Sequence, residues 1–83
     1  MTRAPEGYGL IAKTDMFNGA TVVRAYMHLE EHSRILVLAE YATAFGGRTR
    51  VMLGPFDRRV LQPMILTLKD VESMTSPNFL GDE

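Results

Sequence analysis

Apolar and polar side chains alternate most clearly between residues 20 and 29. The odd-numbered residues Val23, Ala25, Met27 and Leu29 are all apolar. They alternate with a mixed set of even-numbered residues: Val22, Arg24, Tyr26 and His28. A period of two residues is typical of a strand with one apolar face. Asn18-Gly19, which suits the two positive-φ positions of a type I′ turn, lies just before this segment. We therefore predict a hairpin of two strands, Tyr8–Asp15 and Ala20–Leu29.

The next segment, Arg34–Thr43, fits two structures. Helical spacing is shared by Ile35, Leu38, Ala39, Ala42 and Phe45, and Gly46 suits the residue after a helix end. However, the segment opens with a continuous apolar and partly β-branched run, and Phe45-Gly46-Gly47 is typical of a hairpin loop leading into Arg48–Leu53. We favour the strand, which makes the chain a four-stranded antiparallel meander.

The pattern changes after Gly54-Pro55. Asp57 suits the cap of a helix, and Pro63 is tolerated only in a first turn. We predict a short turn from Asp57 to Gln62, followed by a helix. Its apolar stripe, which we expect to be buried, is Met64, Ile65, Leu68 and Val71. The alternative is a last strand, Met64–Val71, in an all-β small barrel.

The predicted fold class is therefore α+β, a four-stranded antiparallel β-meander with one C-terminal helix packed on one face. Eighty-three residues, 46% of them hydrophobic, suit one soluble domain with a small core. We expect a flexible N-terminus over residues 1–7, a single compact domain over residues 8–75 and a loose acidic tail over residues 76–83.

Composition excludes several classes of protein. The chain has no cysteine, which rules out a disulfide scaffold, a thiolate metal site and a cysteine nucleophile. The longest uninterrupted apolar run, Ile35–Ala39, is too short to cross a membrane, and the N-terminus lacks the apolar stretch of a secretory signal. We therefore expect a cytoplasmic protein with no membrane partner.

Few residues suggest catalysis. His28 and His32 are four residues apart, but Leu29 stands where a metalloprotease helix has glutamate, and we interpret the segment as a polar turn that also contains Glu30 and Glu31. The sequence has no nucleophile elbow, phosphate-binding loop or dinucleotide fingerprint. We expect neither an enzyme nor a bound metal or cofactor.

The net charge of −1 conceals an uneven distribution. Residues 48–59 contain four arginines and one aspartate, whereas residues 70–83 contain four acidic residues and no basic one. Alternation places Arg48 and Arg50 on one strand face, and Arg58 and Arg59 follow the Gly-Pro turn. We predict that these four arginines form one anion-binding patch, and we add Arg24 and Tyr26, which share a face of the strand at residues 20–29. The predicted partner-binding residues are Arg48, Arg50, Arg58, Arg59, Arg24 and Tyr26. The alternative is a solvated face that pairs with the acidic tail.

These features favour a small non-catalytic protein-binding module that acts as an inhibitor or adaptor. Phage and mobile-element proteins that block host defence complexes, such as anti-CRISPR proteins, have this general build, and the arginine-rich face would contact an acidic or nucleic-acid-binding surface of such a complex. The alternative is a small nucleic-acid-binding domain that uses the same arginines, with Tyr26 as a base-stacking platform. A homodimer is a further expectation, because an open sheet leaves edges and the core is small.

Overall fold

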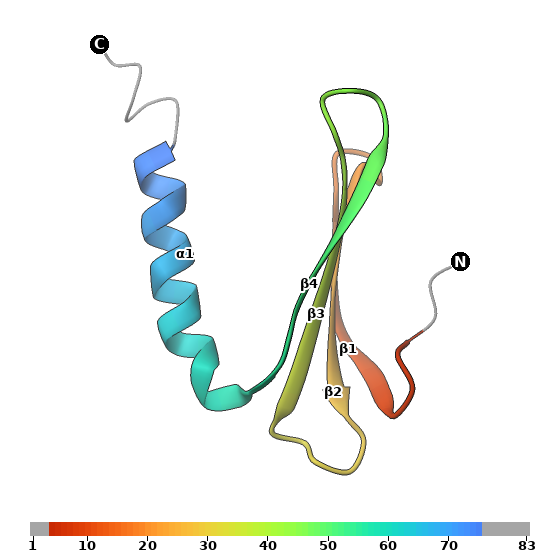
Figure 1. The fold of residues 1–83 in the computed structure, drawn as a ribbon, viewed down its shortest axis with the longest axis vertical. Helices are drawn as coiled ribbons and strands as arrows, with labels where there is room; N and C mark the ends of the chain where they lie inside the picture. The colour runs from red at the N-terminus through yellow and green to blue at the C-terminus, as the bar shows by residue number, and fades with distance from the viewer. Residues whose placement is uncertain (1–3, 76–83) are drawn as a thin grey trace.

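Four antiparallel strands in chain order form the sheet of the computed structural model, which describes residues 4–75 (Figure 1). The strands are β1 (Tyr8–Met16), β2 (Thr21–His28), β3 (Arg34–Ala42) and β4 (Arg48–Asp57). The predicted four-stranded meander is confirmed, and the segment from residue 34 is a strand rather than a helix. The expected acidic tail, residues 76–83, lies outside the described residues, as do the first three residues of the expected flexible N-terminus.

The turn between β1 and β2 begins one residue earlier than predicted. The N–H of Gly19 donates to the carbonyl of Met16 at 3.2 Å, and the two residues between them, Phe17 and Asn18, have φ of 57° and 56°. Positive φ at both central positions is the geometry of a type I′ turn. Phe17 therefore takes the place in the turn that we had predicted for Asn18.

The sheet has one charged face and one uncharged face. In β2, in β3 and in β4 up to Leu53, the strand register brings all odd-numbered residues to one face, and none of them is charged. After an irregularity between Leu10 and Ala12, the even-numbered residues of β1 join this uncharged face. Charged residues of all four strands lie on the other side, which we call the charged face.

The core is small and lies in the two central strands. Among residues 4–75, four side chains are buried: Val22, Tyr26, Ile35 and Leu36. Tyr26 is only 2% exposed, at the centre of the charged face opposite Leu36. All four buried side chains thus come from β2 and β3.

Gly54 marks a distortion in β4, where the pairing with β3 shifts between Ile35 and Val37. Its φ is 102°, and a Cβ at this position would lie 2.8 Å from the carbonyl oxygen of Ile35 and 3.0 Å from the nitrogen of Phe56. Only glycine fits such a backbone without strain or a clash.

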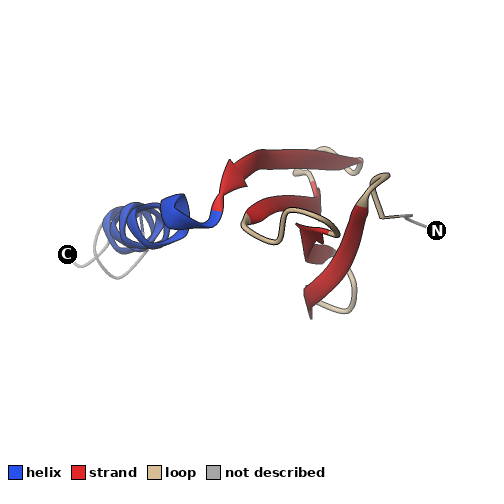
Figure 2. Ribbon diagram, turned by 90° about the horizontal axis from the view of Figure 1, so that it is seen from below, coloured by secondary structure: helices blue, strands red, loops and turns tan. Residues whose placement is uncertain are grey.

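The chain ends in a short 3-10 turn and a helix, η1 (Arg58–Val60) and α1 (Leu61–Thr75). Pro63 lies in the first turn of α1, as predicted, and the all-β barrel is excluded. The prediction that α1 packs on the sheet is wrong, because α1 lies beside the sheet and buries no residue (Figures 1 and 2). The apolar residues Ile65, Leu68 and Val71 are about half exposed. The physical reason is the direct connection of β4 to η1, which leaves no loop to reverse the chain.

Within residues 4–75, no helix has both the length and the apolar character needed to cross a bilayer.

Candidate functional site

Three arginines of the charged face, Arg24, Arg48 and Arg50, act on Glu40. Nη1 of Arg24 donates to Oε1 of Glu40 at 2.9 Å, and Nη2 of Arg50 lies 3.3 Å from the other carboxylate oxygen. The hydrogen bond from Arg24 is the main cause of a lowered pKa of Glu40, and the charges of Arg50 and Arg48 add to it. Arg24 and Glu40 are largely shielded from solvent, whereas Arg50 is mostly exposed. Arg24 is therefore a structural partner of Glu40, and Arg50 is available to a ligand.

Arg48 connects the two hairpin turns at one end of the sheet. Its Nη1 donates to the carbonyl of Gly19 at 3.2 Å, and the N–H of Ala42 donates to the carbonyl of Ala20 at 3.1 Å. The β1–β2 and β3–β4 turns therefore lie side by side, at the upper end of the sheet in Figure 1. Arg48 itself is exposed there.

Each of these two turns presents a phenylalanine to solvent. Phe45 is 98% exposed at the tip of the β3–β4 turn, and Phe17 is 73% exposed in the β1–β2 turn. The β3–β4 turn is closed by hydrogen bonds, including a bond of 2.8 Å from the N–H of Thr43 to the carbonyl of Gly47. We define the hairpin-tip surface as the exposed aromatic and basic residues at this end of the sheet: Phe17, Phe45, Arg48 and Arg50.

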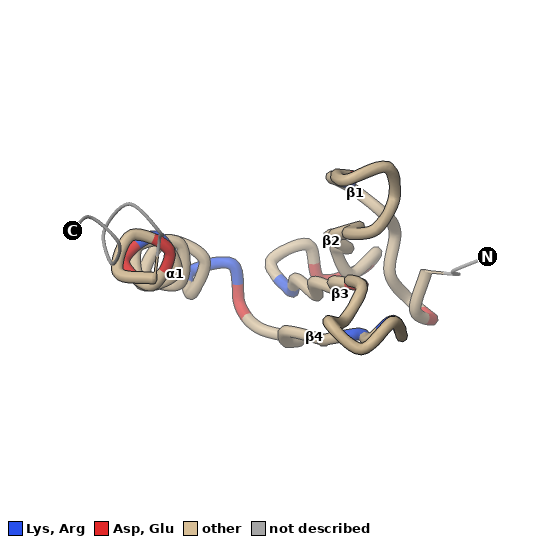
Figure 3. Tube along the Cα trace, turned by 90° about the horizontal axis from the view of Figure 1, so that it is seen from above, with Lys and Arg blue, Asp and Glu red and all other residues tan. Residues whose placement is uncertain are grey.

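Arg58 and Arg59 lie at the opposite end of β4. Eight residues separate Arg50 from Arg58, which in a strand is about 26 Å. Figure 3 shows basic positions both within the sheet and in the segment that joins β4 to α1. The predicted single patch of four arginines is therefore two separate groups.

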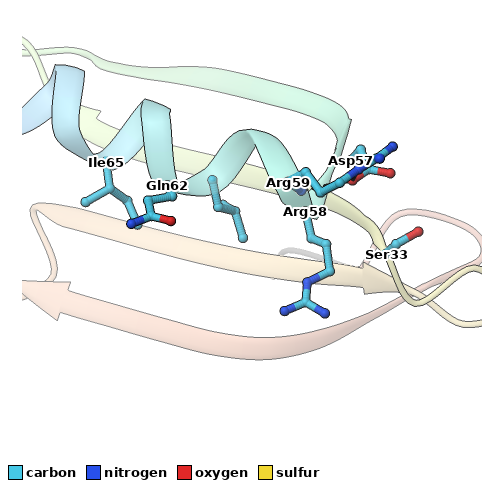
Figure 4. Close-up of a pocket in the computed structure, with 7 residues that line it drawn as sticks. Ser33, Asp57, Arg58, Arg59, Gln62 and Ile65 are labelled. Carbon is cyan, nitrogen blue, oxygen red and sulfur yellow. Dashed lines mark hydrogen bonds and ion pairs between the residues drawn. The ribbon is translucent and has the colours of Figure 1, made fainter.

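The second group is tied to the start of the helix. Oδ1 of Asp57 accepts bonds from the backbone N–H of Arg59 at 2.9 Å and from its Nε at 3.0 Å. These bonds lower the pKa of Asp57, and the same side-chain bond raises the pKa of Arg59. Arg58 points away from Asp57, to the same side as Gln62 and Ile65, along a hollow that Ser33 also lines (Figure 4). Arg59 thus supports the helix cap, while Arg58 is the freer cation of the pair.

Tyr26 cannot act as the stacking platform that the sequence suggested. A base can stack only on an exposed ring, and Tyr26 is the most deeply buried side chain described. Its position within a strand was predicted correctly, but its side chain is buried and not exposed.

The two histidines are used by the β2–β3 turn. Nδ1 of His28 accepts from the N–H groups of Glu30 and Glu31 at 3.2 and 3.0 Å, and Nε2 of His32 lies 3.0 Å from the carbonyl oxygen of Leu29. Over residues 4–75, no group of three or more potential metal ligands occurs.

Sequence reasoning missed the two exposed phenylalanines. Each is next to, or one residue from, a glycine in a predicted turn, Phe17-Asn18-Gly19 and Phe45-Gly46-Gly47. A large aromatic residue in a tight turn has no neighbouring strand to pack on, and this was the signal that could have identified it.

Comparison with protein-family models, with curated proteins and with solved structures gives no match. What the protein does must therefore be inferred from its own surface.

Proposed function

We propose that this protein is a non-catalytic protein-binding module, acting as an inhibitor or adaptor, and that it binds its partner through the hairpin-tip surface. The observation that carries the proposal is the almost complete exposure of Phe45 beside the exposed Phe17. Burying one such ring on a partner contributes about 1.5–3 kcal/mol. Aromatic residues and arginine are the residue types enriched where interfaces gain most of their binding energy.

Arg48 and Arg50 give this surface its charge preference. Glu40 already receives a hydrogen bond from Arg24, so the two outer arginines are not fully neutralised. A positive surface of this kind attracts an acidic patch and orients it during the encounter. The expected partner is therefore a protein with an apolar pocket for a phenylalanine and acidic residues around it.

A protein partner is favoured over a nucleic acid by the small number of cations. Affinity for a nucleic-acid backbone comes largely from the number of phosphates that lysine and arginine side chains neutralise. The hairpin-tip surface offers two arginines, and Arg58 and Arg59 are too far away to extend it.

The test is affinity capture from a lysate of the native host with four versions of the full chain. The wild type and the control Arg58→Glu/Arg59→Glu are expected to retain one protein in stoichiometric amount. The variants Phe17→Ser/Phe45→Ser and Arg48→Glu/Arg50→Glu are expected to lose it at least tenfold, with unchanged circular dichroism. Capture of the same protein by the tip variants, or of none by the wild type, would contradict the proposal. The identity of the captured protein shows whether it belongs to a defence complex.

A second measurement examines nucleic acid directly. Fluorescence anisotropy with labelled single-stranded and duplex DNA at low salt is expected to show no binding. Binding that weakens steeply with salt, with a smaller slope for Arg48→Glu/Arg50→Glu, would replace the proposed function with a nucleic-acid-binding one.

A further inference from the structure

The uncharged face of the sheet lacks the cover that its composition calls for. Across β2, β3 and most of β4 this face carries no charge, and Tyr41, Val51 and Leu53 on it are more than a third exposed. An antiparallel sheet normally packs such a face on another element and leaves its charged face in water. Within residues 4–75, α1 is not placed on it (Figures 2 and 3).

Helix α1 has the shape and chemistry of that missing cover. One side of the helix is apolar from Leu61 to Val71, at spacings of three and four residues, and Glu72 then follows on the same side: Leu61, Met64, Ile65, Leu68 and Val71. Fifteen helical residues span about 22 Å, close to the length of about 26–33 Å expected for strands of eight to ten residues. The helix and the uncharged face can therefore cover each other along most of their length.

The junction between β4 and α1 keeps the helix from covering its own sheet. Asp57 is both the last residue of β4 and the cap of η1, and the N–H of Arg58 donates to the carbonyl of Ser33 at 2.7 Å. Strand and helix thus follow each other without a loop, whereas a chain that folds a helix back on its sheet normally uses two to six residues to turn. The chain therefore carries both halves of an interface and holds them apart.

We propose that a second copy of this chain supplies the cover: α1 of each copy packs on the uncharged face of the other, in a two-fold symmetric dimer. The chain itself supports this occupant. Each copy exposes the apolar side of α1 and part of its uncharged face, and the junction at Asp57 holds the two apart, so two copies can cover both at once.

The reciprocal arrangement is also a closed assembly that cannot add further chains. Both helices are used and both uncharged faces are covered, so a two-fold dimer has no further site for a third chain. Sedimentation equilibrium of the full chain is expected to give twice 9.3 kDa and no larger species. A monomer, or a ladder of longer assemblies, would overturn the proposal.

Matched charge substitutions test the two halves separately. Leu68 lies on the apolar side of α1 and is 52% exposed, whereas Leu66 lies on another side and is 58% exposed. Leu68→Asp is expected to abolish the dimer at concentrations where Leu66→Asp keeps it. On the sheet, Val51→Lys on the uncharged face is expected to abolish the dimer, and Met52→Lys on the charged face is expected to keep it. The proposal would be contradicted if Leu68→Asp and Leu66→Asp dimerised equally, or if Val51→Lys and Met52→Lys did.

Cysteine cross-linking gives a readout that does not depend on destabilising the protein, because the chain has no native cysteine. Two proteins are mixed under oxidation, one with Leu68→Cys and one with Val51→Cys. The proposal predicts a disulfide between the two different chains, whereas Leu66→Cys mixed with Met52→Cys gives less than a tenth of that yield. A disulfide formed only within the double variant Val51→Cys/Leu68→Cys would show that the helix covers its own sheet and would overturn the proposal.

Discussion

Glu40 lies between Arg24 and Arg50 on the charged face, and this pairing makes its protonation state matter for the stability of the sheet. In the folded chain the hydrogen bond from Arg24 holds the pKa of Glu40 below the ordinary value of 4.5. Between that lower pKa and 4.5 the unfolded chain binds more protons than the folded chain. The stabilisation from Glu40 is therefore complete above about pH 4.5 and is lost as the pH falls through the folded-state pKa.

The substitution Glu40→Gln tests this assignment. The variant is expected to unfold at a lower urea concentration than the wild type at pH 7, because Arg24 loses its charged acceptor. The difference is expected to shrink as the pH falls from 4.5 through the lower pKa of folded Glu40, since the wild-type carboxylate becomes protonated there. Urea midpoints measured from pH 7 to pH 3 check both parts, with the exposed turn residue Glu30 changed to Gln as the control. A difference that stays constant across this range would disprove the role of the Glu40 charge.

At the level of single elements, the distortion of β4 depends on Gly54. Gly54→Ala is expected to destabilise the protein in two ways, through a left-handed φ and through contact of the new Cβ with the backbone of Ile35 and Phe56. The left-handed conformation costs about 1–2 kcal/mol, and the clash adds about 1–3 kcal/mol. Urea denaturation measures the loss.

Gly46→Ala is the matched control for Gly54→Ala. Gly46 also has a positive φ, 91°, but a Cβ there meets nothing within 4 Å. This variant is expected to show only the conformational cost. Equal losses for the two variants would mean that the contact with Ile35 and Phe56 relaxes without cost.

The sequence was sufficient to predict the elements because each has a strong local signal. Alternation in β2, the glycines in two turns and Pro63 at a helix start all act over a few residues, so four strands and one helix were predicted. The weaker signals were those of β3, which also fitted a helix, and of the end of β4, which lies at Asp57 and not at Leu53. Where α1 packs was predicted wrongly, since the spacing of Leu68 and Val71 shows which side of the helix is apolar but not which surface it meets. The surface that the helix meets depends on the junction at Asp57, where strand and helix are continuous.

The candidate site was predicted only in part, because local patterns show which face a residue lies on but not how strands from distant parts of the chain surround it. Alternation was enough to place Arg48 and Arg50 on one face, but the burial of Tyr26 depends on strands from distant parts of the chain. The distance between Arg50 and Arg58 was missed because β4 continues to Asp57 instead of ending at Leu53. Sequence neighbours in a strand separate by about 3.3 Å for each residue, and a strand of that length divides the arginines into two groups.

At the scale of the whole molecule, a folded unit made of two chains has a stability that depends on concentration. The proposed dimer predicts that the melting temperature rises with protein concentration, because association favours the folded state. A tenfold increase corresponds to about 1.4 kcal/mol, which for a unit of this size is about 3–6 °C. Differential scanning calorimetry at concentrations a hundredfold apart measures the shift. A constant melting temperature for the wild type would argue that single chains fold alone.

The direct joint between β4 and α1 also has an evolutionary consequence. An insertion of a few residues after Asp57 would free the helix to turn back and cover the sheet of its own chain. If the proposed dimer forms, one insertion or deletion at this place would convert a two-chain protein into a single-chain protein, or the reverse. The number of chains in the proposed folded unit would then be set by the length of one connection.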